Sequence, residues 1–274
     1  MGVNPSRVMK SSCFITIIYA VAFGDEQEIG MPRFFAKPES FRGNSVNIVG
    51  DDAFHIARSL RMAVGDKITV ADTEGYEYSC ILRKIRDDVC ECEVGEKVLS
   101  EAESPVNVTL FMAYPKGDKL ELVIQKAVEL GANKIVPFES SRCVKRPRED
   151  KVEKQSARLL RIAEEAAKQC GRARLSTVAA PLDFDGMLAE AKKSDLALFC
   201  YEGKGTVSLK KVLLQNPGAK SISVVVGCEG GFSENEADEA KKSGLVSVNL
   251  GPRILRCETA PLYAIASISY NYEL

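Results

Sequence analysis

Strand patterns and helix patterns alternate along the chain from Val106 to its end. Apolar runs typical of buried strands occupy residues 106–112, 134–138, 175–179, 195–200, 221–227 and 245–250. We assign helices to the intervening segments 118–130, 151–170, 184–193, 233–243 and 259–272. This alternation predicts a mostly parallel sheet covered by helices on both faces. In such sheets, ligands bind at the carboxyl ends of the strands.

The segment before residue 104 differs, because it is rich in strands and has a single expected helix. Strands are predicted at 46–49, 67–71, 76–86 and 89–98, with turns rich in glycine and aspartate between them. The helix is expected from Asp51 to Met62, with Asp51 or Asp52 as its cap. We therefore predict a small β-barrel over residues 31–103, an acidic linker at 100–105 and an α/β domain over residues 104–274.

The first 30 residues do not fit this globular pattern. Residues 13–23 form an apolar run that is too short to span a bilayer but as long as the core of a signal peptide. No small-residue cleavage site follows the run, and Met31 resembles a second translation start. We expect residues 1–30 to be a non-native or disordered extension, translated upstream. A targeting segment is the alternative.

The amino-acid composition limits which metal sites and which binding partners the chain can have. The chain has nine cysteines, no Cys-x-x-Cys pair and one histidine, His55, so a zinc site of the usual spacing is excluded. Many free thiols are typical of a reducing compartment, and we expect a cytoplasmic protein that uses no metal and binds no membrane. Lys and Arg number 37 against 38 Asp and Glu, so any nucleic-acid contact must come from a local patch.

A local basic patch lies between Arg142 and Arg174. This window holds eleven basic and five acidic residues, counted along the sequence. Five of the basic residues share one face of the helix expected at 151–170 and its end, namely Lys154, Arg158, Arg161, Lys168 and Arg172. The stripe is either a solvated helix face or a track for the phosphates of a nucleic acid.

A glycine-rich loop follows the strand expected at 221–227. It reads Gly-Cys-Glu-Gly-Gly-Phe over residues 227–232, with Ser233 as the expected cap of the next helix. Glycines directly after a buried strand let the backbone approach a ligand closely. Glu229 disfavours a phosphate ligand, and neither phosphate-binding glycine motif occurs in the chain. A neutral or cationic planar ligand fits better, unless the glycines serve only the chain reversal.

A second segment with unusual chemistry joins the strand expected at 245–250 to the last helix. It passes through Gly251 and Pro252 and carries Arg256 and Glu258 just before an apolar helix. From the residues alone, Glu258 or Thr259 could be a helix cap and Arg256 a surface cation.

Four motifs in the same order resemble the RsmE family of ribosomal RNA small-subunit methyltransferases, which belongs to the SPOUT superfamily. They are Lys-Gly-Asp-Lys at 116–119 with Gln-Lys-Ala-Val-Glu-Leu-Gly at 125–131, Glu-Ala-Ala-Lys-Gln-Cys-Gly-Arg at 165–172, the glycine-rich loop, and Leu-Gly-Pro-Arg-Ile-Leu-Arg-Cys-Glu-Thr-Ala at 250–260. The resemblance covers residues 31–274. It implies a PUA-like amino-terminal β-barrel and a SPOUT-type parallel sheet with a deep trefoil knot.

The resemblance also implies an activity. The family transfers a methyl group from S-adenosylmethionine to the ring N3 of a uridine in 16S ribosomal RNA, usually as a homodimer acting on the small ribosomal subunit. The rival interpretations are a SPOUT enzyme with another ribosomal or transfer RNA target, and a non-catalytic RNA-binding protein. Intact glycines and an intact Arg256 argue against loss of catalysis.

Site residues carried over from the resemblance fall into three groups. The methyl donor is expected to contact Tyr201, Gly227, Glu229, Gly230, Gly231, Leu250, Gly251, Leu255 and Arg256. The catalytic candidates are Arg256, Arg172 and Glu258, with the arginines stabilising a uracil anion and Glu258 either accepting the proton or orienting Arg256. The RNA-binding candidates are Arg33, Arg58, Arg61, Arg142, Lys145, Arg146, Arg158, Arg161 and Arg172.

Three small departures from the family pattern involve cysteine. Cys228 stands where proline is common, Cys257 where threonine is common and Cys170 where serine is common. We expect altered rigidity at these positions and intact function.

Overall fold

The computed structural model of the protein describes residues 31–144 and 152–274. The predicted extension at 1–30 and the RNA-binding candidates Lys145 and Arg146 lie outside the described residues. Residues from Arg33 to Leu274 form one compact unit with two sheets, each of which has its own buried apolar cluster.

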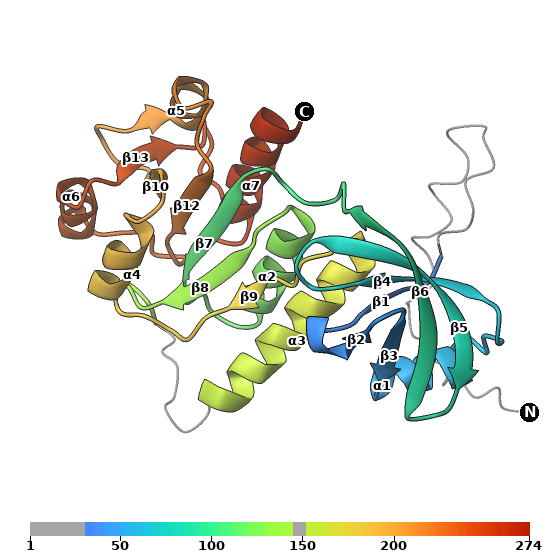
Figure 1. The fold of residues 1–274 in the computed structure, drawn as a ribbon. Coiled ribbons are helices and arrows are strands. Elements are labelled where there is room, and N and C mark those ends of the chain that lie inside the picture. The colour runs from blue at the N-terminus through green and yellow to red at the C-terminus, as the bar shows by residue number, and fades with distance from the viewer. Residues whose placement is uncertain (1–30, 145–151) are drawn as a thin grey trace, which may run out of the picture. The chain divides into compact units, whose positions relative to one another are not determined.

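The first sheet has six strands and mixed pairing. Its strands are β1 (Arg33–Phe35), β2 (Phe41–Arg42), β3 (Ser45–Val49), β4 (Lys67–Ala71), β5 (Tyr76–Ile85) and β6 (Val89–Leu99). Their order is β1-β4-β5-β6-β3-β2, in which only β1 and β4 pair in parallel (Figure 1). The sheet curls over its apolar cluster, but β1 and β2 remain its edges. The predicted barrel is therefore an open half-barrel.

The helix of this region begins at Asp51, as expected, but it has a different cap and is less regular than a continuous α-helix. Gly50, with a φ of 66°, is the cap of α1 (Asp51–Phe54), and neither Asp51 nor Asp52 caps it with a side chain. The following turn, His55–Ser59, is a π-helix. The ring of His55 lies edge-on to that of Phe34, with ring centroids 6.5 Å apart. The predicted cap was wrong because the positive φ favours glycine, and the two aspartates instead occupy the first turn.

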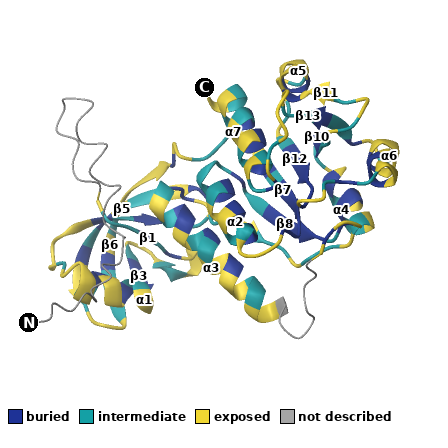
Figure 2. Cartoon of the chain, turned by 180° about the vertical axis from the view of Figure 1, so that it is seen from behind, coloured by how far each residue is buried: buried dark blue, intermediate teal, exposed yellow. Residues whose placement is uncertain are grey.

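The second sheet is all-parallel and has seven strands. They are β7 (Asn107–Ala113), β8 (Lys134–Phe138), β9 (Thr177–Val178), β10 (Leu196–Cys200), β11 (Val207–Ser208), β12 (Ser221–Val226) and β13 (Val246–Asn249). The order is β11-β13-β10-β12-β7-β8-β9. The central strands are buried along almost their whole length (Figure 2), which is why they read as continuous apolar runs.

Helices cover both faces of this sheet, as predicted. Helices α2 (Lys119–Glu129), α3 (Val152–Cys170), α5 (Leu209–Gln215) and α7 (Thr259–Glu273) lie on one face. Helices α4 (Phe184–Ala191) and α6 (Glu234–Lys242) lie on the other (Figure 1). Ser233 caps α6 in a full capping box with Glu236. Only β11 and α5 were not predicted within this region.

Candidate active site

One cavity of about 870 Å³ opens at the carboxyl ends of β10, β12 and β13. This is the edge at which an open parallel sheet binds ligands. All nine residues predicted to contact the methyl donor line it, from Tyr201 through the 227–231 loop to Arg256, and so does Glu258. The 227–231 and 250–258 segments, which are separate in the sequence, thus share one cavity, as a methyl-donor site built from both requires. The roles of these residues in binding stay predictions.

The glycine-rich loop after β12 is folded tightly on itself. A Cβ atom at Gly227 would lie 3.2 Å from backbone atoms of Gly231, and Gly231 has a φ of 61°. The next residue, Phe232, is buried and packs at a tilt against Phe199 of β10, with ring centroids 4.2 Å apart. Glycine is required at both positions for different reasons, and Phe232 fixes the end of the loop in the core.

Residues after β8 hold the glycine-rich loop from outside. The Arg142 guanidinium donates to the carbonyl oxygen of Gly230 at 2.8 Å, and the Cys228 thiol donates to the carbonyl oxygen of Arg142 at 3.3 Å. The buried carboxylate of Glu236 accepts from the backbone N–H and the hydroxyl of Ser141 at 2.7 and 2.9 Å. Arg142 thus lines the cavity and anchors its loop, although its contact with RNA is only predicted.

The segment before α7 presents Arg256 to the cavity. Gly251 has a φ of 105°, which turns the chain after β13. The Arg256 side chain is exposed and forms no hydrogen bond or ion pair with another residue in 31–144 or 152–274. Its guanidinium is therefore available to a ligand. Glu258 does not orient it through any contact within that part of the chain.

Sequence reasoning missed Lys119, the first residue of α2, which also lines the cavity. Its ammonium nitrogen lies 3.0 Å from Oε1 of Glu229 and 3.1 Å from Oε2 of Glu258. The Lys-Gly-Asp-Lys motif was the available signal, but no local pattern shows which residues a lysine meets. The two carboxylates raise the pKa of Lys119, so it stays protonated at neutral pH.

Both carboxylates that Lys119 binds are stabilised as anions. Burial alone raises the pKa of Glu229, but hydrogen bonds from Lys119 and from backbone N–H groups outweigh it and lower the pKa. The pKa of Glu258 is lowered first by its own backbone N–H, and then by the Cys257 thiol and Lys119. Two anions and a shared cation therefore lie at the cavity wall.

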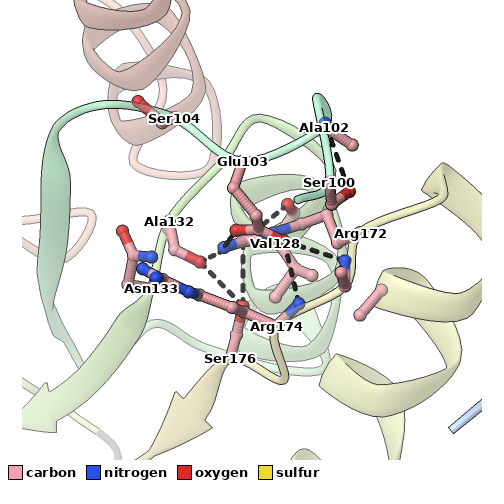
Figure 3. A network of polar contacts seen from close by, with 12 residues as sticks. Ser100, Ala102, Glu103, Ser104, Val128, Ala132, Asn133, Arg172, Arg174 and Ser176 are labelled. Carbon is pink, nitrogen blue, oxygen red and sulfur yellow. Dashed lines mark hydrogen bonds and ion pairs between the residues drawn. The ribbon is translucent and has the colours of Figure 1, made fainter. Parts of the chain in front are cut away.

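Arg172 lies elsewhere, in a buried polar network (Figure 3). Only 2% of it is exposed, and Nη1 donates to the carbonyl oxygens of Val128 and Ala132 and to the Ser176 hydroxyl. Nη2 pairs with Glu103 at 2.9 Å. Arg172 is not among the residues that line the cavity. The structure therefore does not bring Arg172 to the cavity with Arg256, and its guanidinium donors bind groups inside the protein.

The remaining basic candidates are mostly paired with carboxylates. Arg33 pairs with Glu77 at 2.8 Å in the half-barrel. The exposed pairs are Arg58–Asp87 at 2.6 Å, Arg158–Glu121 at 2.8 Å and Arg161–Glu165 at 2.9 Å. Arg61 has a φ of 51° and is exposed. Exposed ion pairs are weak, so phosphates can compete with the carboxylates for these cations. Because Arg158 and Arg161 are paired, the basic face of their helix is less positive than the sequence implied.

Two features are absent from the described part of the chain, a metal cluster and a membrane-spanning helix. Among residues 31–144 and 152–274, no cluster of three or more His, Cys, Asp and Glu side chains could hold a metal ion. Within the same ranges, no helix is long and apolar enough to cross a membrane.

Comparison with known proteins decides the family. Residues 102–269 match the model of an RNA methyltransferase domain, and residues 48–94 match that of an RNA methyltransferase PUA domain. The Bacillus subtilis ribosomal RNA small subunit methyltransferase E is 36% identical over 251 residues, which are 89% of this chain and 98% of the relative. The chain belongs to the ribosomal RNA small subunit methyltransferase E family. The resemblance seen in its motifs is thereby confirmed.

Two further relatives support this family membership. The Synechocystis ribosomal RNA small subunit methyltransferase E is 34% identical over 86% of this chain and 77% of the relative. The crystal structure of a ribosomal RNA small subunit methyltransferase E from Neisseria gonorrhoeae, bound to S-adenosyl methionine, aligns with a TM-score of 0.76 at 30% identity. That alignment covers 87% of this chain and 97% of the other.

Proposed function

We propose that the protein transfers a methyl group from S-adenosylmethionine to N3 of a uridine in 16S ribosomal RNA. The observation that carries the proposal is the convergence of the 227–231 and 250–258 segments on one cavity, in a member of this enzyme family. The target RNA is inferred from the relatives, which are ribosomal RNA small subunit methyltransferases. The methyl donor follows from the molecule bound in the gonococcal structure.

The cavity fits this methyl donor in size and chemistry. Its volume of about 870 Å³ lies within the usual range for small-molecule sites. The tight turn at Gly227 and the positive φ values of Gly231 and Gly251 expose backbone groups that can bind an adenine edge. The anionic carboxylates of Glu229 and Glu258 suit a sulfonium cation and would repel a phosphate.

The residues of this chain supply alignment and charge. Methyl transfer is an in-line displacement, so loops that fix the donor against the uracil nitrogen account for much of the acceleration. The nitrogen must lose its proton, and the unpaired guanidinium of Arg256 is positioned to stabilise the resulting anion. Glu258 is the candidate proton acceptor. Because N3 lies on the pairing edge, the uridine must be unpaired when it reacts.

Mapping of methylated nucleosides tests the proposal. Small ribosomal subunits from a strain lacking this protein are incubated with the purified protein and S-adenosylmethionine, and their RNA is digested and analysed by mass spectrometry. We expect 3-methyluridine to appear in 16S RNA. A different mark, or a mark in transfer RNA, would contradict the target, and failure of the protein to bind S-adenosylmethionine in calorimetry would contradict the activity.

We further propose that residues 31–103 bind RNA and residues 104–274 form the methyltransferase domain. The two sheets and their separate apolar clusters support this division. The exposed cations Arg58, Arg61, Arg158 and Arg161 are the RNA-binding candidates that geometry leaves accessible. They would bind phosphates, which can replace the carboxylate partners of Arg58, Arg158 and Arg161.

We also propose that the methyltransferase domain contains the trefoil knot of its family. β13 pairs with both β10 and β11, so it lies between two strands that residues 201–206 connect. A strand from later in the chain thus lies inside a loop formed by earlier residues. This arrangement supports threading of the chain through that loop. Pulling the two chain ends apart in optical tweezers tests it. A knotted chain unfolds to a contour length shorter than its residue number predicts, and full length would contradict the knot.

The protein is proposed to act as a homodimer in the cytoplasm. Apolar side chains are exposed on and near α5 and α7, namely Leu214, Ile254, Tyr263 and Tyr270 at 62, 82, 44 and 73%. Exposed apolar groups gathered on neighbouring helices suit a second copy of the chain. The eight cysteines of the described residues are all free, which suits a reducing compartment. Light scattering gives the mass in solution, and a monomer would contradict the dimer.

A further inference from the structure

Lys119 stands in a position that its own helix disfavours. It is the first residue of α2, where the helix dipole places partial positive charge. A cation there is destabilised unless other groups offset it. The offset comes from Glu229 and Glu258, which lie more than a hundred residues further along the chain. This placement needs an explanation beyond helix stability.

The contacts of Lys119 link three separate segments. Its ammonium reaches Glu229 in the glycine-rich loop and Glu258 in the segment before α7, and it lies 3.8 Å from the Cys257 sulfur. The backbone N–H of Lys116 also donates to Glu229, at 3.1 and 3.3 Å from its two oxygens. The start of α2 therefore holds together the two loops that line the cavity.

The cluster is half-exposed and faces the cavity. The side chains of Lys119, Glu229 and Glu258 are 34, 29 and 17% exposed, and all three residues line the cavity wall. Without the ammonium, two carboxylates would face each other across the gap between the loops. Their repulsion would push the loops apart and favour protonation of one of them.

We propose that Lys119 is a positioning residue for methyl transfer, which holds Glu229 and Glu258 at a fixed spacing and so sets the distance between the two donor-binding loops. It acts through these carboxylates and does not take up the uracil proton, since its ammonium has no acceptor site. The inference rests on the proposed function, because it concerns the same cavity. It adds a residue that neither the motif analysis nor the family comparison assigns.

Steady-state kinetics and calorimetry test the inference with Lys119→Met, Lys119→Arg and Lys126→Met. Lys119→Met keeps the length of the side chain without its charge, and we expect kcat/KM to fall about 10- to 100-fold because small misplacements are costly. Lys119→Arg keeps the cation and should recover most of this loss. Lys126→Met is the matched control: it lies on the same helix, pairs only with Glu129 and should match the wild type.

The pH dependence of donor binding separates positioning from mere stabilisation. In the wild type both carboxylates have lowered pKa values, so affinity for S-adenosylmethionine stays level between about pH 5 and about pH 7. Loss of the ammonium raises these pKa values, so affinity in Lys119→Met falls as pH drops through that range. Lys119→Arg should remain level. The other charged groups that line the cavity are Arg142, Glu202, Glu234, Arg253 and Arg256, and all are unchanged in these variants.

The outcomes are distinguishable. If the wild type binds no S-adenosylmethionine, the proposed function fails. If the wild type binds and methylates, but Lys119→Met matches it in kcat/KM and in pH dependence, the positioning role is wrong. A lower melting temperature of Lys119→Met with an unchanged pH dependence of the Kd would also contradict it, since that is the result of a purely structural contact.

Discussion

Arg172 and Arg256 both lie in motifs that carry the family resemblance, yet the structure gives them opposite surroundings. Arg172 is buried, and its guanidinium binds Glu103, two carbonyl oxygens and Ser176. Arg256 is exposed at the cavity, with no side-chain partner in the described ranges 31–144 and 152–274. An arginine whose donors are all used inside the protein stabilises the fold. One whose donors are free can serve a ligand.

The largest expected effect is on stability, from Arg172→Met. Removing one partner of a buried ion pair leaves Glu103 without its counterion, which costs about 3–5 kcal/mol. We expect the free energy of unfolding in urea to fall by that amount. The double variant Arg172→Met with Glu103→Leu should recover part of the loss, because no unpaired charge is then buried. A single variant as stable as the wild type would contradict the structural role.

The next effect is on turnover, from Arg256→Ala. The substitution removes the cation that stabilises the uracil anion, and we expect kcat to fall about 10²- to 10³-fold, as for loss of an oxyanion donor. The melting temperature should not change, because Arg256 has no partner to lose in the described ranges. The control is Arg83→Ala, which removes an exposed arginine paired with Glu93 in the half-barrel. Wild-type turnover in Arg256→Ala would remove it from the catalytic residues.

A smaller effect on donor affinity is expected from Gly227→Ala. The added Cβ lies 3.2 Å from Gly231 and must displace the loop that faces the donor. We expect the Kd for S-adenosylmethionine, measured by calorimetry, to rise about tenfold, which is 1.4 kcal/mol. Gly218→Ala is the matched control, since a Cβ there meets nothing within 4 Å. Equal affinities in the two variants would show that the loop tolerates the shift.

The smallest effect is expected from Arg158→Ala and Arg161→Ala. Both arginine side chains are exposed and each is already paired with a carboxylate, so each substitution should weaken binding to 16S RNA fragments by less than about 1 kcal/mol. If each contacts a phosphate, the slope of affinity against salt should decrease by about one. Filter binding over a range of salt concentrations measures both quantities. An unchanged slope would identify the stripe as a solvated helix face.

Local pattern predicted most of the fold, because buried strands and amphipathic helices leave strong periodic signals. The runs that became β7, β8, β10, β12 and β13 were all expected within one or two residues. Strand β11 and helix α5 were missed because the strand has two exposed residues and the helix is short. The predicted small β-barrel is an open half-barrel, and no local pattern in the sequence shows whether the edges β1 and β2 meet.

The site was predicted where backbone chemistry dominates and missed where distant side chains meet. Glycines at 227, 231 and 251 are visible in the sequence, and they line the cavity. The burial of Arg172 could not be foreseen because its partner Glu103 is 69 residues away. Lys119 was missed because its partners are still farther along the chain. A sequence shows which residues can carry charge, but only the fold determines which charges neutralise each other.

The spread of the cavity residues along the chain bears on how the enzyme is made. Lys119 is synthesised before Glu229 and Glu258, which lie more than a hundred residues further along the chain. A nascent polypeptide therefore cannot complete the cavity until the segment through Glu258 has been produced. Incomplete translation products would lack it, and so would not compete with the finished enzyme for S-adenosylmethionine.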